Sequence, residues 1–398
     1  MTETAATRNA APDALASVLA DASFVRLVAS DDGDSLAAAG LIAKALRTNA
    51  TPFQVRIDRD PGPDGAEGGQ ADARREPDDT AIRIGTMAGD HAVPGVDRPA
   101  STTAFAVARE LGDDPDPVLA LAGVVAAGSV PGTDGSGDAL AVAESGDVVR
   151  RRPGVAIPIA DPADGVSAST LVRTSYSGDP EATRAALAEL GLPASLDDEA
   201  HRRLASLVAV DVVGAESASD RAASAVERAL RPYAIERVEP AAPFATVGGY
   251  ADVLEALAHE EPGTGVALAL ADDPSDELRS AALDVWRTHG VDAHRALDGA
   301  TTGRYDGCVV TRIDATPATL PTIARLVRDF RSPEPVAIAV DEAAGEIAVS
   351  AVDPLGIEAV CRGVAREFDG DGWGTETRGG VSVSNDTTEA LAALREAL

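Results

Sequence analysis

The stretch from residue 24 to residue 41, FVRLVASDDGDSLAAAGL, restricts the fold of this chain more than any other. An apolar run of strand length ends at a group of carboxylates, and a helix of small residues begins at once. This order is typical of a parallel strand and its crossover helix, and open α/β sheets bind ligands at the carboxyl ends of such strands. We therefore expect Asp32 and Asp34 at the ligand-binding edge of a sheet.

Two roles are open for these carboxylates. Asp and Ser are preferred at helix N-termini, because their oxygens accept hydrogen bonds from free N–H groups and offset the helix dipole. Two Asp side chains on one turn can also bind a divalent cation, Mg²⁺ or Mn²⁺, through oxygen. The spacing is compatible with both roles and favours capping.

The 398-residue chain has a formal net charge of −31, and Lys44 is its only lysine. Acidic residues are spread along its whole length, which is typical of cytoplasmic proteins of extreme halophiles. At about 1 M salt the Debye length is only about 3 Å. A nucleic-acid partner would therefore be held by close contacts, by shape or by stacking, and the lack of a broad basic face does not exclude one.

Cys308 and Cys361 are isolated in apolar surroundings, which predicts buried thiols in a reducing cytoplasm. The sequence has neither a signal-peptide pattern nor an apolar stretch of membrane-spanning length. We expect a soluble cytoplasmic protein with no membrane partner. Four histidines have no metal-ligand spacing and are expected at the surface or at helix ends: His201, His259, His289 and His294.

Strands and helices are expected to alternate along most of the chain, which predicts an α/β fold. The expected strands are 24–29, 53–58, 81–86, 154–159, 265–270, 305–313, 335–340 and 345–351. The expected helices are 35–48, 101–112 (capped by Ser101 or Thr102), 116–128, several within 178–235, 275–289, 317–330, 354–367 and one at the C-terminus. Residues 59–80 are expected to form a mobile acidic loop.

Proline residues at 239–243 suggest a domain boundary. We predict a parallel-sheet N-terminal domain with a helical extension over 1–238, and a smaller α/β C-terminal domain over 239–398, with a cleft between them.

The order of segments resembles the DHH phosphoesterase superfamily, and within it the RecJ-like proteins of haloarchaea. Active members carry a His-x-Asp-x-Asp-Gly turn after the first strand. Here Asp32 and Asp34 match the two aspartates, whereas Ser30 replaces the His and Ser35 follows where the family has Gly. Further stretches with a RecJ-like sequence are 119–128, 154–159, 169–170 and 177–179, and 304–310 resembles the start of the DHH-associated domain.

The departures from the family pattern concern its metal ligands. Active relatives hold two manganese ions with several Asp and His side chains, including the Asp-His-His of the superfamily name, and this motif is missing here. Asp90, His91 and Asp97 are the nearest substitutes. Two-metal hydrolysis needs two cations about 3.5–4 Å apart. We therefore expect Asp32 and Asp34 to hold a single Mn²⁺ or Mg²⁺ at most.

A glycine-rich stretch, 369–380, stands where the family has a Gly-Gly-Gly-His substrate loop. Glycine lets backbone N–H groups approach a phosphate, arginine can clamp one, and tryptophan can stack on a base. The alternative is a structural turn. The resemblance implies phosphate or nucleic-acid binding by Gly372, Trp373, Gly374, Thr375, Arg378, Gly379 and Gly380. Two other basic groups, 150–152 and Arg325 with Arg328 and Arg331, either contact phosphates or form exposed faces.

Together these features predict a RecJ-like protein of DNA replication or repair that is catalytically silent. It would bind single-stranded nucleic acid or act as a scaffold in a replication complex, for which the resemblance implies a GINS-type partner. One alternative is an active Mn-dependent single-stranded-DNA exonuclease or small-nucleotide phosphoesterase, which requires Asp32, Asp34, Asp90, His91 and Asp97 to converge. The other is a pure protein-interaction subunit.

Overall fold

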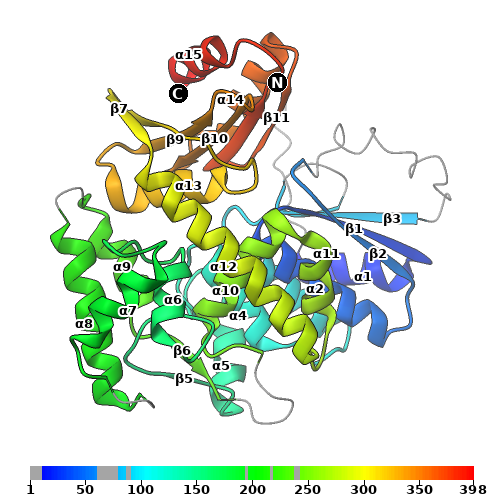
Figure 1. Ribbon diagram of the computed structural model, residues 1–398. Helices are drawn as coiled ribbons and strands as arrows, with labels where there is room; N and C mark the ends of the chain where they lie inside the picture. Colours follow the sequence, from blue (N-terminus) through cyan, green and yellow to red (C-terminus); the bar gives the residue numbers. More distant parts are fainter. Residues whose placement is uncertain (1–10, 61–78, 87–90, 193–195, 216–217, 237–242) are drawn as a thin grey trace. The chain divides into compact units, whose positions relative to one another are not determined.

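The computed structural model describes residues 11–60, 79–86, 91–192, 196–215, 218–236 and 243–398 (Figure 1). The chain divides into two compact units. Unit 1 comprises Met1–Gly146 with Pro262–Asp272, and unit 2 comprises Asp147–Glu261 with Asp273–Leu398. The predicted domain boundary falls within 237–242 and most of the predicted loop within 61–78, both outside the described residues.

Unit 1 contains a parallel four-stranded sheet of order β2-β1-β3-β4. Its elements are α1 (Pro12–Asp21), β1 (Phe24–Ser30), α2 (Gly33–Thr48), β2 (Phe53–Asp58), β3 (Asp79–Ile84), β4 (Ala92–Val93), α3 (Ala100–Glu110), α4 (Pro117–Ala126), α5 (Gly137–Ser145) and α11 (Pro262–Leu270). The predicted strand–helix–strand order after residue 24 is confirmed, and β1 is a central strand, paired on both sides.

Helix α11 corrects one prediction, because residues 265–270 were expected to form a strand. Pro262 begins this helix, where a missing N–H costs nothing, and alanine and leucine are strong helix formers. The helix packs closely on α2: a Cβ placed at Gly40 would lie 2.7 Å from the Cβ of Ala269. Lys44 of α2 also forms an ion pair with Asp272 at 2.9 Å.

Unit 2 begins with a helical region and a two-stranded ribbon, and ends with a six-stranded mixed sheet of order β11-β12-β10-β9-β8-β7. Its first elements are β5 (Val149–Arg151), α6 (Pro162–Ala168), α7 (Pro180–Ala188), α8 (Asp198–Gly214), α9 (Ala222–Ala229), β6 (Tyr233–Ile235), α10 (Val247–Glu260) and α12 (Asp276–Asp298). The rest are β7 (Thr301–Tyr305), β8 (Cys308–Arg312), α13 (Leu320–Leu326), the π-helical turn η3 (Val327–Arg331), β9 (Val336–Asp341), β10 (Glu346–Ala351), α14 (Ile357–Glu367), β11 (Asp371–Gly374), β12 (Arg378–Ser382) and α15 (Thr387–Ala397).

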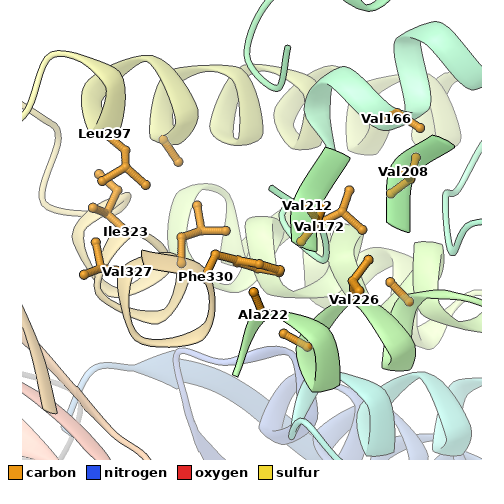
Figure 2. Close-up of a cluster of buried hydrophobic side chains, with 14 of the residues drawn as sticks. Val166, Val172, Val208, Val212, Ala222, Val226, Leu297, Ile323, Val327 and Phe330 are labelled. Atoms are coloured by element: carbon orange, nitrogen blue, oxygen red, sulfur yellow. The ribbon is translucent and has the colours of Figure 1, made fainter. Parts of the chain in front are cut away.

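The six-stranded sheet is covered by apolar residues on both faces, which explains why every residue of β9 is buried. Ala337 and Ala339 of β9 belong to one core, together with Ile323 of α13 and helices of the preceding region. Val336 and Ile338 point into a second core with residues of α14 and α15. Figure 2 shows the first core, which contains Phe330 of η3 together with valine side chains of α8 and α9. The predicted α/β architecture with a mixed C-terminal sheet is therefore confirmed.

Two further predictions about unit 2 need correction. The expected strand 154–159 makes a single isolated bridge, Val155 to Leu230, because Pro153 and Pro158 interrupt ladder pairing. The glycine-rich stretch, for which the sequence left a substrate loop and a structural turn open, is a hairpin of β11 and β12. His289 and His294, expected near the surface, are 2% and 0% exposed. The buried positions predicted for Cys308 and Cys361 are confirmed.

None of the helices in the described ranges combines the length and apolar composition that a membrane crossing requires.

Close packing at Gly290 leads to the first prediction. A Cβ at this position of α12 would lie 1.8 Å from the carbonyl oxygen of Ala168. We expect Gly290→Ala to lower the free energy of unfolding by about 2–3 kcal/mol, because the helix must move away from that backbone. Gly363 of α14 is the matched control, since a Cβ there meets nothing within 4 Å. Gly363→Ala should raise stability by about 0.5–1 kcal/mol. Thermal melts in concentrated KCl measure both, and equal effects would contradict the packing.

Candidate functional site

The acidic turn of unit 1 joins β1 to α2 at the carboxyl end of the sheet. Asp32 is 3% exposed and occupies the N-cap of α2. Its Oδ1 accepts a hydrogen bond from the backbone N–H of Ser35 at 2.9 Å, and its Oδ2 accepts one from the Ser35 hydroxyl at 2.8 Å. The sequence left capping and metal binding open for Asp32, and in these contacts Asp32 caps α2.

Asp34 lies one residue inside α2 and caps a different helix. Its Oδ2 accepts a hydrogen bond from the N–H of Ala100 at 2.6 Å, and its Oδ1 accepts one from the N–H of Ser101 at 3.0 Å. These are the first N–H groups of α3, whose own cap residue, Pro99, offers no side-chain acceptor. The expectation that Ser101 or Thr102 caps this helix is wrong, because the acceptor is supplied by a distant turn.

Burial gives the Asp34 carboxyl an unusual proton affinity. Asp34 is only 5% exposed. Burial and, to a smaller extent, the negative charge of Asp32 raise the pKa of Asp34 to about 7, against the opposing hydrogen bonds from Ser101 and Ala100. The pair of aspartates is thus a costly arrangement without a cation, and the N-terminus of α3 offsets only part of the cost.

Small residues close the space beside this turn. Gly85 directly follows β3 with φ +83°, a backbone conformation that favours glycine. A Cβ at Gly85 would lie 2.3 Å from Ser35 Oγ and 2.4 Å from Ser30 Oγ. An aspartate after the third strand, as in active members of the resembled family, therefore does not fit this packing. The Ser30 hydroxyl, in the position of the family's histidine, donates to the carbonyl of Ile84 at 3.3 Å.

The donor set in the described part of unit 1 does not fit a pair of metal ions. All four carboxylate oxygens of Asp32 and Asp34 accept hydrogen bonds from protein groups. No three His, Cys, Asp or Glu side chains among the described residues are placed to hold a metal, so His91 and Asp97 do not complete a site with these two. Asp90 lies outside the described residues.

Close packing explains the glycines of the hairpin in unit 2. A Cβ at Gly372 would lie 2.5 Å from the carbonyl oxygen of Cys361, and one at Gly374 would lie 2.6 Å from that of Arg378. A Cβ at Gly379 would lie 2.5 Å from the carbonyl oxygen of Trp373, and one at Gly380 would lie 2.6 Å from its ring. The hairpin thus packs on itself and on α14. Thr375 continues the hairpin turn, donating its N–H to the carbonyl of Arg378 at 2.7 Å.

Arg378 begins β12 and is the cross-strand neighbour of Ser350 on β10. The Ser350 hydroxyl accepts a hydrogen bond from Arg328 Nη1 at 3.0 Å. Arg328 also donates to Asp329 at 2.8 Å, and Arg228 of α9 lies 3.5 Å from the other oxygen of that carboxylate. Although burial raises the pKa of Asp329, the charges of Arg328, Arg325 and Arg228 hold it below its ordinary value.

Arg325 connects these groups to a buried polar network on α10. Its guanidinium donates to the carbonyl and hydroxyl of Thr170 at 3.1 and 2.7 Å. Thr170 and the indole of Trp286 in turn donate to Asp252, which is 2% exposed. We call Arg228, Arg325, Arg328 and Arg378 the arginine cluster.

One helical turn further along α10, Glu255 extends the same network. Its carboxylate lies 3.5 Å from His259 Nε2. Burial raises the pKa of Glu255, but the hydrogen bond and charge of His259 and the charges of Arg378 and Arg325 bring it well below its ordinary value. The sequence does not predict that Arg228, Glu255 and His259 belong to this network. Their spacing follows no motif, and only the fold brings them to the arginines.

Comparison with known proteins identifies the family. The chain is 45% identical over 394 residues to the protein named "Uncharacterized protein rrnAC1427" of Haloarcula marismortui, covering 97% of this chain and 96% of that one. The family model described as "Uncharacterized protein rrnAC1427, C-terminal domain" matches residues 300–396. The chain belongs to the rrnAC1427 family.

Solved structures of other proteins share its fold. CDC45 from Entamoeba histolytica aligns with a TM-score of 0.58 at 8% identity over 97% of each chain. RecJ from Thermus thermophilus, solved with Mn²⁺, aligns with a TM-score of 0.52 at 14% identity. The alignment covers 97% of this chain but 54% of that RecJ chain. The predicted RecJ-like fold is confirmed by these likenesses.

The raised pKa of Asp34 predicts how its variants depend on pH. Below about pH 4 the carboxyl is protonated in both folded and unfolded chains, and above about pH 7 it is charged in both at the full cost of burial. Asp34→Asn removes that cost, so we expect it to stabilise the fold by about 2 kcal/mol at about pH 8, with the gain fading as the pH falls. Thermal melts across this range give the measurement.

Asp34→Ala is the matched comparison. It removes both the charge and the acceptor for the N–H groups of Ala100 and Ser101. At low pH, where the charge no longer matters, this variant should be less stable than the native chain by about 1 kcal/mol. A native chain more stable than Asp34→Asn at about pH 8 would mean that the ionised carboxylate is favourable, as a bound cation would make it.

Proposed function

We propose that this chain is a catalytically silent RecJ-like protein that binds single-stranded nucleic acid, in DNA replication or repair. The observation that carries the proposal is the use of Asp32 and Asp34 as helix caps. Two-metal hydrolysis needs several charged ligands around two adjacent cations. The packing of Ser30 and Ser35 on Gly85 fills the position where a further ligand would stand.

The arginine cluster supports the nucleic-acid part of the proposal. Three guanidinium groups, of Arg228, Arg325 and Arg328, act on Asp329, and Arg325 with Arg378 acts on Glu255, in a chain whose net charge is −31. Arginine binds phosphate through paired N–H groups, a contact that survives where salt screens longer-range attraction. Arg378, in the position implied by the family resemblance, belongs to this cluster.

A scaffolding role in a replication complex is compatible with the same surface. The likeness to CDC45 concerns the fold, and a GINS-type partner is part of the proposal. Mn²⁺ or Mg²⁺ would have at most Asp32 and Asp34 as carboxylate ligands in the described part of unit 1.

The silent site predicts the outcome of a nuclease assay. With 5′-labelled single-stranded DNA, Mn²⁺ and concentrated KCl, we expect no degradation above that of a mock-purified sample, because the chain cannot clamp two cations. Asp32→Ala should behave identically to the native chain. Robust degradation that is abolished by Asp32→Ala would refute catalytic silence.

The arginine cluster predicts a binding defect. Arg378→Ser should weaken binding of fluorescein-labelled oligo-dT by about 10-fold and reduce the salt dependence of log K by about 1, because one phosphate contact is lost. Arg304 of β7 provides the control, since its side chain is 68% exposed at the edge of the same sheet. Fluorescence anisotropy in a series of KCl concentrations measures both. If Arg304→Ser and Arg378→Ser weaken binding equally, the cluster is not the binding site.

A further inference from the structure

A second basic feature of unit 2 lies on the small ribbon formed by β5 and β6. We define the β5–β6 ribbon as residues 149–152 and 231–236. Four arginines and one glutamate are the charged residues of these two segments: Arg150, Arg151, Arg152, Arg231 and Glu236. In a chain with 65 acidic and 34 basic residues, this excess of arginine is the reverse of the general composition.

The guanidinium groups of the ribbon are held in place by their neighbours. Arg151 lies over the ring of Tyr233, with its Cζ 5.7 Å from the ring centroid, and its Nε donates to the carbonyl of Arg231 at 3.4 Å. On the other face, Glu236 forms ion pairs with Arg150, at 3.1 Å, and with Arg152. Ordered guanidinium groups lose less conformational freedom when they bind an anion.

Arg231 has a backbone conformation that is unfavourable for its side chain. Its φ is +56°, in the left-handed region, where a residue other than glycine is destabilised by about 1–2 kcal/mol. Its N–H donates to the carbonyl of Gly154 at 3.3 Å, and Pro232 follows. The turn keeps this exposed arginine beside Arg151, which fits a function for its position.

The ribbon is continuous with the arginine cluster along the chain. Arg228 of the cluster stands in the last turn of α9, three residues before Arg231. The backbone between them is fixed, because Ala156 donates its N–H to the carbonyl of Ala229 at 2.8 Å. Arg228 therefore connects Asp329 of η3 to the segment that leads directly into the β5–β6 ribbon; Figure 1 shows the course of this backbone from α9 to β6.

We propose that the β5–β6 ribbon is a second contact for the sugar-phosphate backbone of a single strand whose first contact is the arginine cluster, through Arg150, Arg151 and Arg231. This inference rests on the proposed function. It adds that the bound strand must be long enough to reach both contacts. Arg152 is left out because it pairs with Glu236 and lies near His201, on which the charges of Asp197 and Asp198 also act. A nucleic acid is favoured over an acidic protein because Tyr233 adds an aromatic ring to the row of guanidinium groups.

The test compares two lengths of labelled oligo-dT, about 8 and about 30 nucleotides, because a short strand occupies one contact and a long one both. The ribbon variant is Arg150→Ser/Arg151→Ser/Arg231→Ser. The control, Arg184→Ser/Arg202→Ser/Arg366→Ser, removes three exposed arginines of unit 2 and changes the net charge equally. Binding is measured by anisotropy across a KCl series, and thermal melts verify that both variants are folded.

We expect the ribbon variant to bind the long strand at least about 10-fold more weakly than the control, with a salt slope smaller by about 2, and the short strand equally well. Equal binding of the long strand by both variants would overturn the second contact while leaving the proposed function intact. Failure of the native chain to bind either strand would overturn both. Displacement of the long strand by polyglutamate at equal charge concentration would assign the ribbon to an acidic protein and refute the proposal.

Discussion

The bonds from the α3 N-terminus to Asp34 are the interaction on which the organisation of unit 1 depends. They tie the turn after the central strand to a helix whose first residue lies 66 positions later in the sequence. A buried carboxylate is expensive in an apolar environment, and the free N–H groups of a helix are equally costly when unpaired. Each group satisfies the other, and these hydrogen bonds partly oppose the burial and the Asp32 charge that raise the pKa of Asp34. A carboxylate engaged in this way has little capacity left for a cation.

Close contacts among small residues reinforce that arrangement. A Cβ at Gly123 of α4 would lie 2.5 Å from the Cβ of Ser101 and 2.9 Å from that of Ala37. Helices α2, α3 and α4 therefore approach one another at the same end of the sheet where Gly85 meets Ser30 and Ser35. Enlarging the space for metal ligands would require these contacts to open, and close-packed interiors resist such changes. The capping contacts of the two aspartates and the tight packing beside them are two aspects of one structure.

Secondary structure could be predicted from the sequence where the local pattern and the fold agree. The turn at 30–35 was placed correctly because an apolar run, carboxylates and small residues follow one another within a few positions. The strand predicted at 265–270 is wrong, because GVALAL has no alternation of apolar and polar residues to separate a buried strand from a helix. Length and propensity favour the helix here. The role of Asp34 could not be predicted either, because an acceptor supplied to a distant helix has no local sequence pattern. The same limit applies to Arg228, which reaches Asp329 only through the packing of α9 on η3.

Charge carries different information in the two units. In unit 1 the carboxylate serves as a cap, because Ala100 and Ser101 donate to separate oxygens of Asp34, whereas an uncharged asparagine would offer only one. In unit 2, by contrast, arginines gather on a few carboxylates: Asp329 is acted on by three guanidinium groups and Glu255 by two. At high ionic strength, attraction beyond a few ångströms is screened, and only groups in direct contact contribute to binding. Clustering, rather than net charge, is therefore the property by which a chain this acidic can recognise a polyanion.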